Sequence, residues 1–170
     1  AHLVLLAENQ EGYQNLCRLA SVAALEGFYH KPRIDKDLLQ QHSGGLIGLS
    51  ACLKGEIPQL LGAGRMEEAD AAARWYQEVL GPDNFFLEIQ NNGMAAQEEM
   101  NTALAEMSQR LSLPLVGTND CHYLDENDSS VHELSLCLQT GKTINDPGRF
   151  RFETNQLNFK SRQEMIDFLV

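Results

Sequence analysis

The feature that most constrains this chain is the alternation of short apolar runs with longer helical patterns. Each run is only a few residues long, is rich in Leu, Ile, Val or Phe, and is bounded by Gly, Pro, Asn or polar residues, as buried strands are. The four runs are residues 3–7, 45–50, 84–90 and 113–119. Between and after them, apolar residues at three- and four-residue spacing predict helices. These cover residues 9–26, 66–80 and 94–111, and a further helix from about Asp128 to Thr140, capped by Asp125 or Asn127.

Strands that alternate with helices in this way predict an α/β fold with parallel strands. The strands are apolar on both faces, which is typical of sheets covered by helices or closed into a barrel. The pattern alone does not separate a barrel fragment from an open sheet. Residues 141–160 differ in character from the rest and predict an extended connector rather than core.

The charge of the chain limits the substrates that it can bind unaided. The 170 residues are 43% hydrophobic, enough for one cored domain or a large piece of one, and carry a formal net charge of −11. Such a surface repels phosphate backbones, so a polyanionic substrate would need a local cationic centre such as metal ions. No apolar run approaches the roughly 18 residues of a membrane span, and no signal peptide opens the chain. We therefore expect a cytoplasmic protein, away from membranes, with cysteines that are reduced or bind metal rather than form disulfides.

Metal-binding residue types follow two of the predicted strands. Asp120 and His122 come after residues 113–117, and Cys52 comes after residues 45–50. Functional groups gather at the carboxyl ends of parallel strands, and O, N and S donors together are typical of zinc and tolerated by manganese or iron. His2 stands at the opposite end of its predicted strand, where geometry places it less well. An Asp-x-His pair is also typical of a capping turn, and a lone cysteine of a buried apolar position, so both interpretations stay open.

Three further features lie near the candidate ligands or carry charge that could meet a substrate. Cys121 lies between two candidate ligands, and we expect its side chain to point away and to be structural. His132 lies on a predicted helix without the second histidine, four residues on, that a helical zinc-protease motif requires. Lys31 and Arg33 form the one concentrated basic stretch, which could meet a phosphate or pair with the acidic surface.

Several longer segments carry a resemblance to a known family. They are "HLVLLAENQEGYQNLCRLAS", "EGFYHKPRIDKDLL", "GLIGLSACLKGEIPQLL", "PLVGTNDCHYLDENDSSVHELSLCLQTGKTI" and "FKSRQEM", in this order. Together they resemble the amino-terminal PHP (polymerase and histidinol phosphatase) domain of the C-family replicative DNA polymerases, the alpha subunits of bacterial DNA polymerase III. The resemblance covers essentially the whole chain.

This resemblance implies a partial, distorted (β/α)7 TIM-like barrel. The motifs that open the family, a His-x-His pair and further ligands, are missing upstream of His2, so the first strands of the barrel are missing too. Residues 1–140 would form the carboxyl-terminal part of the PHP domain, and residues 141–170 a connector towards the polymerase palm domain. The chain also lacks an initiator methionine and stops within an amphipathic helical pattern, so we expect an internal segment of a longer polypeptide.

The resemblance also implies the ligands of a metal cluster. His2 matches the histidine of the "HL-LLA" motif, Cys52 the cysteine of "LSxCLxGEIP", and Asp120 and His122 the closing Asp-x-His. Divalent ions, zinc or manganese, would support 3′–5′ exonuclease or phosphoesterase chemistry. In family members without metal the domain is instead a structural platform for partners. Lys31 and Arg33 would steer the strand end.

For the parent protein, the resemblance implies template-directed DNA synthesis in chromosomal replication, with magnesium as the polymerase cofactor. Its partners would be DNA, deoxynucleotides and other replicase subunits, namely the proofreading exonuclease and the sliding clamp. We expect neither nucleotide transfer nor robust hydrolysis from this segment alone. The alternatives are a free-standing PHP-family phosphoesterase and an error-prone relative of the polymerase. The segments "EGFYHKPRID" and "FKSRQEM" favour the main replicative form.

Overall fold

Four short strands alternate with helices in the computed structural model, which describes residues 1–169. The strands are β1 (Val4–Ala7), β2 (Leu46–Leu49), β3 (Phe85–Gln90) and β4 (Leu115–Thr118). Each lies inside one of the four apolar runs, so the predicted α/β class is confirmed.

The helices also follow the predicted ranges closely. They are α1 (Gln10–Leu25), α2 (Lys36–Gln41), α3 (Glu56–Gly62), α4 (Met66–Leu80), α5 (Ala95–Leu111), α6 (Ser129–Thr140) and α7 (Arg162–Leu169), with a 3-10 turn η1 (Glu126–Asp128) before α6. The short helices α2 and α3 were not predicted, because six or seven residues are too few for a helical period to stand out.

The four strands form one mixed sheet in the order β1-β2-β3-β4. Strands β2 and β3 are parallel, as expected, but β1 runs antiparallel to β2, with Val4 opposite Leu49. The prediction of parallel strands is therefore wrong for this pair. The physical reason lies in the connection between β1 and β2, which holds the helices α1 and α2. This connection brings the chain back to the same end of the sheet at which β1 stops, so β2 must run in the opposite direction. There the backbone N–H of Glu8 donates to the carbonyl of Gly45 at 2.9 Å.

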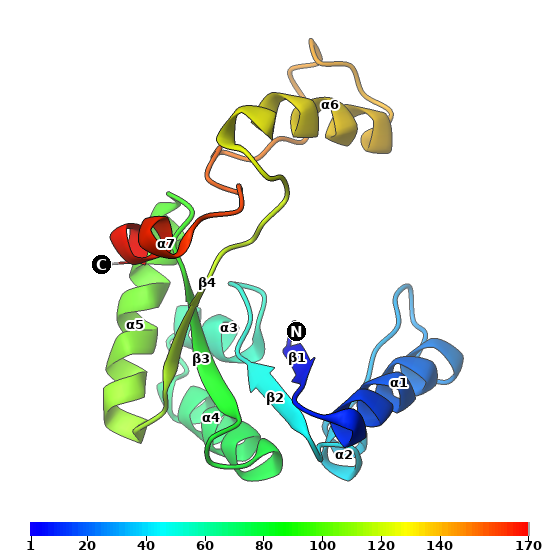
Figure 1. The fold of residues 1–170 in the computed structure, drawn as a ribbon, viewed down its shortest axis with the longest axis vertical. Helices are drawn as coiled ribbons and strands as arrows, with labels where there is room; N and C mark the ends of the chain where they lie inside the picture. The colour runs from blue at the N-terminus through cyan, green and yellow to red at the C-terminus, as the bar shows by residue number, and fades with distance from the viewer. Residues whose placement is uncertain (170) are drawn as a thin grey trace. The chain divides into compact units, whose positions relative to one another are not determined.

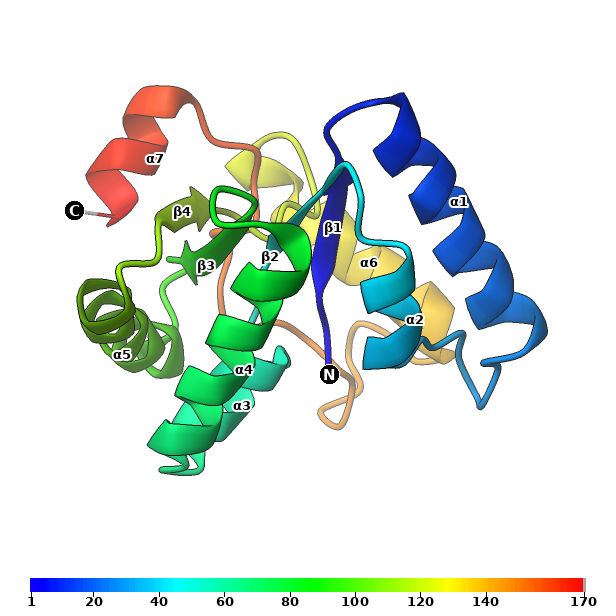
Figure 2. The same ribbon diagram turned by 90° about the horizontal axis from the view of Figure 1, so that it is seen from below.

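Burial differs between the middle and the edges of the sheet. On β2 and β3, Leu46, Phe85 and Leu87 are fully buried, which fits strands covered on both faces. The edge strands are more open, since Leu6 on β1 and Leu115 on β4 remain 49% and 39% exposed. Helix α1 packs against β1 and β2, and α4 packs against β2 and lies beside α3 (Figures 1 and 2).

The chain divides into two compact units. Unit 1 comprises Ala1–Glu88 and Ala103–Val116, and unit 2 comprises Ile89–Thr102 and the residues from Gly117 onward. Residues 141–160, all described, hold no helix or regular strand. Leu157 is nevertheless only 1% exposed, so this part of the connector belongs to the core of unit 2. Among the helices described, none has the length and apolar character needed to cross a membrane.

Candidate metal-binding site

In unit 1, His2 and Cys52 lie next to each other. His2 comes just before β1, and Cys52 comes after β2. Because β1 is antiparallel to β2, the amino end of β1 lies beside the carboxyl end of β2. The His2 Nδ1 and Cys52 Sγ atoms are 3.6 Å apart. Parallel strands would place His2 at the opposite end of the sheet from Cys52. The antiparallel direction of β1 explains why the two residues meet.

The turn that carries Cys52 is fixed by its own backbone. The N–H of Gly55 donates to the carbonyl of Cys52 at 2.7 Å, and the N–H of His2 donates to the carbonyl of Lys54 at 2.8 Å. A Cβ atom on Gly55 would lie 2.1 Å from the carbonyl oxygen of Ser50, so only glycine fits here. These contacts fix the backbone that carries the His2 imidazole and the Cys52 thiol.

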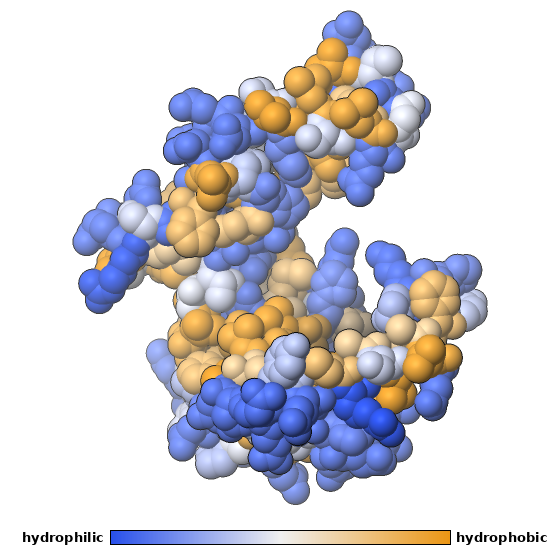
Figure 3. All heavy atoms as spheres, turned by 45° about the vertical axis from the view of Figure 1, so that its right-hand side comes forward, coloured by the Kyte–Doolittle hydropathy of each residue, from blue (hydrophilic) through white to orange (hydrophobic). Residues whose placement is uncertain are grey.

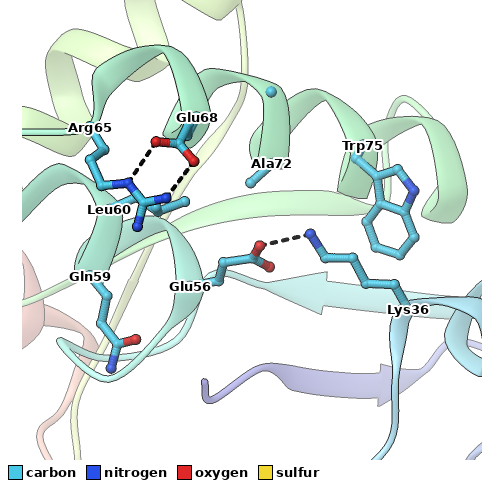
Figure 4. A pocket seen from close by; sticks show the side chains of 9 residues that line it. Lys36, Glu56, Gln59, Leu60, Arg65, Glu68, Ala72 and Trp75 are labelled. Carbon is cyan, nitrogen blue, oxygen red and sulfur yellow. Dashed lines mark hydrogen bonds and ion pairs between the residues drawn. The ribbon is translucent and has the colours of Figure 1, made fainter.

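Behind this turn, the first residue of α3 is tied to two other helices. The Glu56 carboxylate pairs with the Lys36 ammonium at 2.7 Å and accepts a hydrogen bond from the Tyr76 hydroxyl at 2.7 Å. Figure 4 shows the Lys36–Glu56 pair, with Trp75 beside the lysine; the ammonium lies 4.9 Å from the Trp75 ring centre. Cations over aromatic faces are attracted by the ring quadrupole.

The ionisation of this cluster follows from its contacts. Burial by itself raises the pKa of Glu56, but the hydrogen bonds from Lys36 and Tyr76 outweigh it and lower that pKa below its usual value. Burial, followed by the hydrogen bond to Glu56, raises the pKa of Tyr76. The cluster is thus a carboxylate held ionised by one cation and one neutral phenol.

In unit 2, Asp120 and His122 follow β4 as predicted, with His122 Nε2 3.2 Å from Asp120 Oδ1. The backbone N–H of His122 donates to the carbonyl of Leu157 at 2.8 Å, so the connector holds this segment. The capping box of the following turn is made by Asp125 with Asp128. The capping role considered for the Asp-x-His pair therefore belongs to another aspartate.

His132, which the sequence offered no reason to select, contacts this pair. Its Nε2 lies 3.3 Å from Nδ1 of His122. Its ring stacks on Phe152 at 5.7 Å between centroids and lies 5.6 Å from the ring of Tyr123. Burial, and secondly the neighbouring His122, lower the pKa of His132. A search for a second histidine on the same helix could not find this contact, because the partner lies in the preceding loop.

The remaining candidates are more peripheral. The Cys121 thiol donates a hydrogen bond to the carbonyl oxygen of Asn158 at 3.7 Å. Lys31 and Arg33 are exposed, and the Arg33 guanidinium lies 5.3 Å from the centre of the Tyr29 ring. Arg33 also lines a cavity of unit 1 to which His2 contributes. Of the two basic residues, Arg33 is thus the one that shares a cavity with a candidate ligand.

The two pairs can be tested against the geometry of a metal site. With metal–sulfur and metal–nitrogen distances of about 2.3 and 2.0–2.1 Å, a tetrahedral ion separates its N and S ligands by about 3.6 Å, and its N and O ligands by about 3.3 Å. The observed separations are 3.6 Å for His2–Cys52 and 3.2 Å for Asp120–His122. Each pair therefore fits one edge of such a site.

The four candidates form two pairs, one in each compact unit. His2 and Cys52 belong to unit 1, whereas Asp120 and His122 belong to unit 2. Within residues 1–169, no group of three or more His, Cys, Asp or Glu side chains is arranged to hold a metal ion. The four-ligand set stays a prediction.

Comparison with known proteins decides the family. The model of the PHP domain matches residues 1–92, more than half of the chain. The chain belongs to the PHP family. Among similar proteins are DNA polymerase III subunits alpha from Treponema pallidum (45% identical), Deinococcus radiodurans (46%) and Thermus aquaticus (46%), each over 96% of this chain. The chain spans only 14%, 12% and 13% of the length of these three relatives.

The PHP match takes in both residues of the unit 1 pair. It covers His2 and Cys52, and also the basic residues Lys31 and Arg33. Asp120 and His122 lie beyond the 92 matched residues. The PHP match thus lies almost wholly in unit 1, whereas the similarity to the polymerase subunits covers nearly the whole chain.

Proposed function

We propose that this chain is part of the alpha subunit of a bacterial replicative DNA polymerase, which carries out template-directed DNA synthesis in the cytoplasm. The support is 41–46% identity to subunits of that name over 96–98% of the chain. The parent protein would use DNA and deoxynucleotides, with magnesium, and would assemble with a proofreading exonuclease and a sliding clamp. Residues 1–140 would complete a (β/α)7 barrel with upstream strands, and residues 141–170 would lead to the palm domain.

Within that protein, His2, Cys52, Asp120 and His122 are proposed as ligands of divalent zinc or manganese ions in a 3′–5′ exonuclease or phosphoesterase site. The observation that carries this proposal is that both pairs are spaced as neighbouring ligands of one ion are. Such ions lower the pKa of a bound water and neutralise charge on the scissile phosphate. The four side chains would act as ligands, and would need to be deprotonated at the coordinating atoms.

The two basic residues have a supporting role in this proposal. Arg33 lines the cavity that His2 also lines, and its guanidinium would meet a phosphate oxygen of a strand end. Lys31 is exposed two residues earlier and would add positive charge at the same loop. In a chain of net charge −11, such local cations are what an approaching polyanion requires.

A second candidate function is a structural platform without metal. The observation that favours it is a group of exposed apolar side chains on and beside α6, visible in Figure 3. They are Leu124, Val131, Leu134 and Leu138, between 52% and 86% exposed. Exposed apolar patches of this kind are typical of protein–protein interaction sites. In this case the segment would dock other parts of the replicase.

Metal content of the full-length protein separates the two candidates. The hydrolytic proposal predicts bound zinc or manganese by elemental analysis, and 3′–5′ degradation of a labelled single strand. The Asp120→Ala/His122→Ala variant and the His2→Ala/Cys52→Ala variant should each lose metal and exonuclease activity while retaining DNA synthesis. Cys17→Ala is the matched control, because Cys17 is an exposed cysteine outside both pairs.

Two results would contradict the hydrolytic proposal. One is a full-length protein without stoichiometric metal, which would leave the platform as the function of this segment. The other is an Asp120→Ala/His122→Ala variant that degrades DNA at the wild-type rate, which would move the nuclease to another part of the protein.

A further inference from the structure

The contacts of His122 in unit 2 suggest a role for His132 that the ligand motif does not contain. The His122 imidazole lies between two groups: its Nε2 faces Asp120 Oδ1 at 3.2 Å, and its Nδ1 faces His132 Nε2 at 3.3 Å. The two ring nitrogens of a histidine point in different directions, so only one of them can serve an ion shared with Asp120. That nitrogen is Nε2.

A histidine that binds metal through one nitrogen must carry its proton on the other. In metal sites, that second N–H is almost always donated to an acceptor, which fixes the tautomer and the orientation of the ring. The hydrogen-bond partner of His122 Nδ1 is Nε2 of His132. A neutral imidazole nitrogen without a proton is a hydrogen-bond acceptor.

His132 is held in position to serve as that acceptor. Phe152 stacks on its ring, with 26° between the planes, and also meets the ring of His122 edge-on at 4.9 Å. The chain near Phe152 is in turn fixed on α6, because Arg149 Nη2 donates to Glu133 Oε1 at 2.8 Å. Both imidazoles are therefore braced by the same aromatic ring.

We propose that His132 is a positioning residue for the metal site: it accepts the Nδ1–H of His122, and so keeps the lone pair of His122 Nε2 directed towards Asp120 and the ion. The inference rests on the proposed metal-binding function, since it assigns how one ligand is oriented. It adds a third residue, on α6, to the Asp120–His122 pair of unit 2.

The test measures zinc affinity of the full-length protein by competition with a chromophoric chelator, and the visible spectrum of bound Co²⁺ as a probe of ligand geometry. His132→Phe keeps an aromatic ring against Phe152 but removes the acceptor. It should weaken zinc binding by roughly 10–100-fold, the usual effect of losing such a partner, and alter the Co²⁺ spectrum. His132→Gln places an amide oxygen near the position of Nε2, and should restore most of the affinity and the spectrum.

His42→Phe in unit 1 is the control for replacing a histidine by phenylalanine, and should leave both readouts unchanged. If His132→Phe binds zinc as tightly as the wild type, the inference is wrong. If glutamine fails to rescue, His132 is a ligand or a purely structural residue, and the inference is again wrong. A His122→Ala variant with wild-type zinc affinity would instead overturn the proposed function, so the two failures are distinguishable.

Discussion

The Tyr76 hydroxyl offers the sharpest test of how unit 1 supports its part of the site. Tyr76→Phe removes one oxygen atom, and with it the 2.7 Å hydrogen bond to Glu56 at the start of α3. The ring keeps its other contacts, which are the stacking on Phe85 at 5.2 Å, the edge-on contact with Trp75 at 5.0 Å and the Lys36 ammonium 5.4 Å away. The substitution therefore changes a single interaction.

The size of the effect follows from the kind of bond and its exposure. A hydrogen bond to a charged group contributes about 1.5–3 kcal/mol when it is well buried. The Glu56 side chain retains 28% of its exposure and keeps its pairing with Lys36, so solvent and the lysine compensate in part. We expect α3 to lose about 1–1.5 kcal/mol of stability against local opening. Since 1.36 kcal/mol is a factor of ten, backbone amides of α3 should exchange roughly five- to thirteen-fold faster.

Hydrogen–deuterium exchange of the full-length protein, read by mass spectrometry in peptides covering Glu56–Gly62, measures this change. Tyr13→Phe is the control, because Tyr13 is exposed on α1. Unchanged exchange in α3 of Tyr76→Phe, or an equal acceleration in Tyr13→Phe, would refute the argument that this hydroxyl anchors the helix.

The ratio of the α3 exchange rates of Tyr76→Phe and wild type should depend on pH, because the folded state shifts the pKa of Glu56. The folded state lowers the pKa of Glu56, so its contribution is complete above the unfolded value of 4.5 and is lost as pH falls through the lower folded value. The ratio of exchange rates between Tyr76→Phe and wild type should therefore shrink as pH drops below about 4.5. A ratio that grows on acidification would contradict the sign of this shift.

Two further predictions concern the backbone and the brace of the site. Gly55→Ala should weaken zinc binding by about tenfold or more, because the added Cβ would lie 2.1 Å from the Ser50 carbonyl oxygen and shift the turn that carries Cys52. Gly148→Ala is the control and should not weaken zinc binding, because its Cβ would meet nothing closer than 3.5 Å. Arg149→Met should lower the free energy of local opening of residues 149–157, measured by hydrogen–deuterium exchange, by about 1–3 kcal/mol. The reason is that the Arg149 side chain is only 10% exposed in its pair with Glu133. The more exposed Lys142, replaced by Met, should cost at most about 1 kcal/mol.

The predictable part of the fold is the part coded by local pattern. The helix Met66–Leu80 begins and ends where the sequence predicts, because acidic residues occupy its first turn and Gly81-Pro82 stops it. The direction of β1 was not predictable in this way. It depends on where the connection of two helices returns the chain, and that is decided by tertiary packing such as the contact of Glu8 with Gly45.

The same division holds for the candidate site. Asp120 and His122 are only two residues apart in the sequence, so their proximity after β4 is a local feature of the chain. His132 and Phe152 reach His122 only because η1 turns the chain and the connector folds back over α6. These contacts join residues ten and thirty positions apart in the sequence, and they depend on two changes of chain direction. No rule based on sequence spacing predicts them.

The direction of β1 also decides the value of His2 as a ligand candidate. A strand rises about 3.3 Å per residue. Reversing the direction of β1 would therefore move His2, which precedes it, by well over 10 Å, from one end of the strands to the other. Parallel pairing would have put the imidazole at the amino end of β2, far from Cys52. Antiparallel pairing instead gives the observed 3.6 Å between Nδ1 and Sγ. The rule that functional groups gather at carboxyl ends thus extends to the amino end of an antiparallel neighbour, and a ligand search restricted to residues after strands would have missed this histidine.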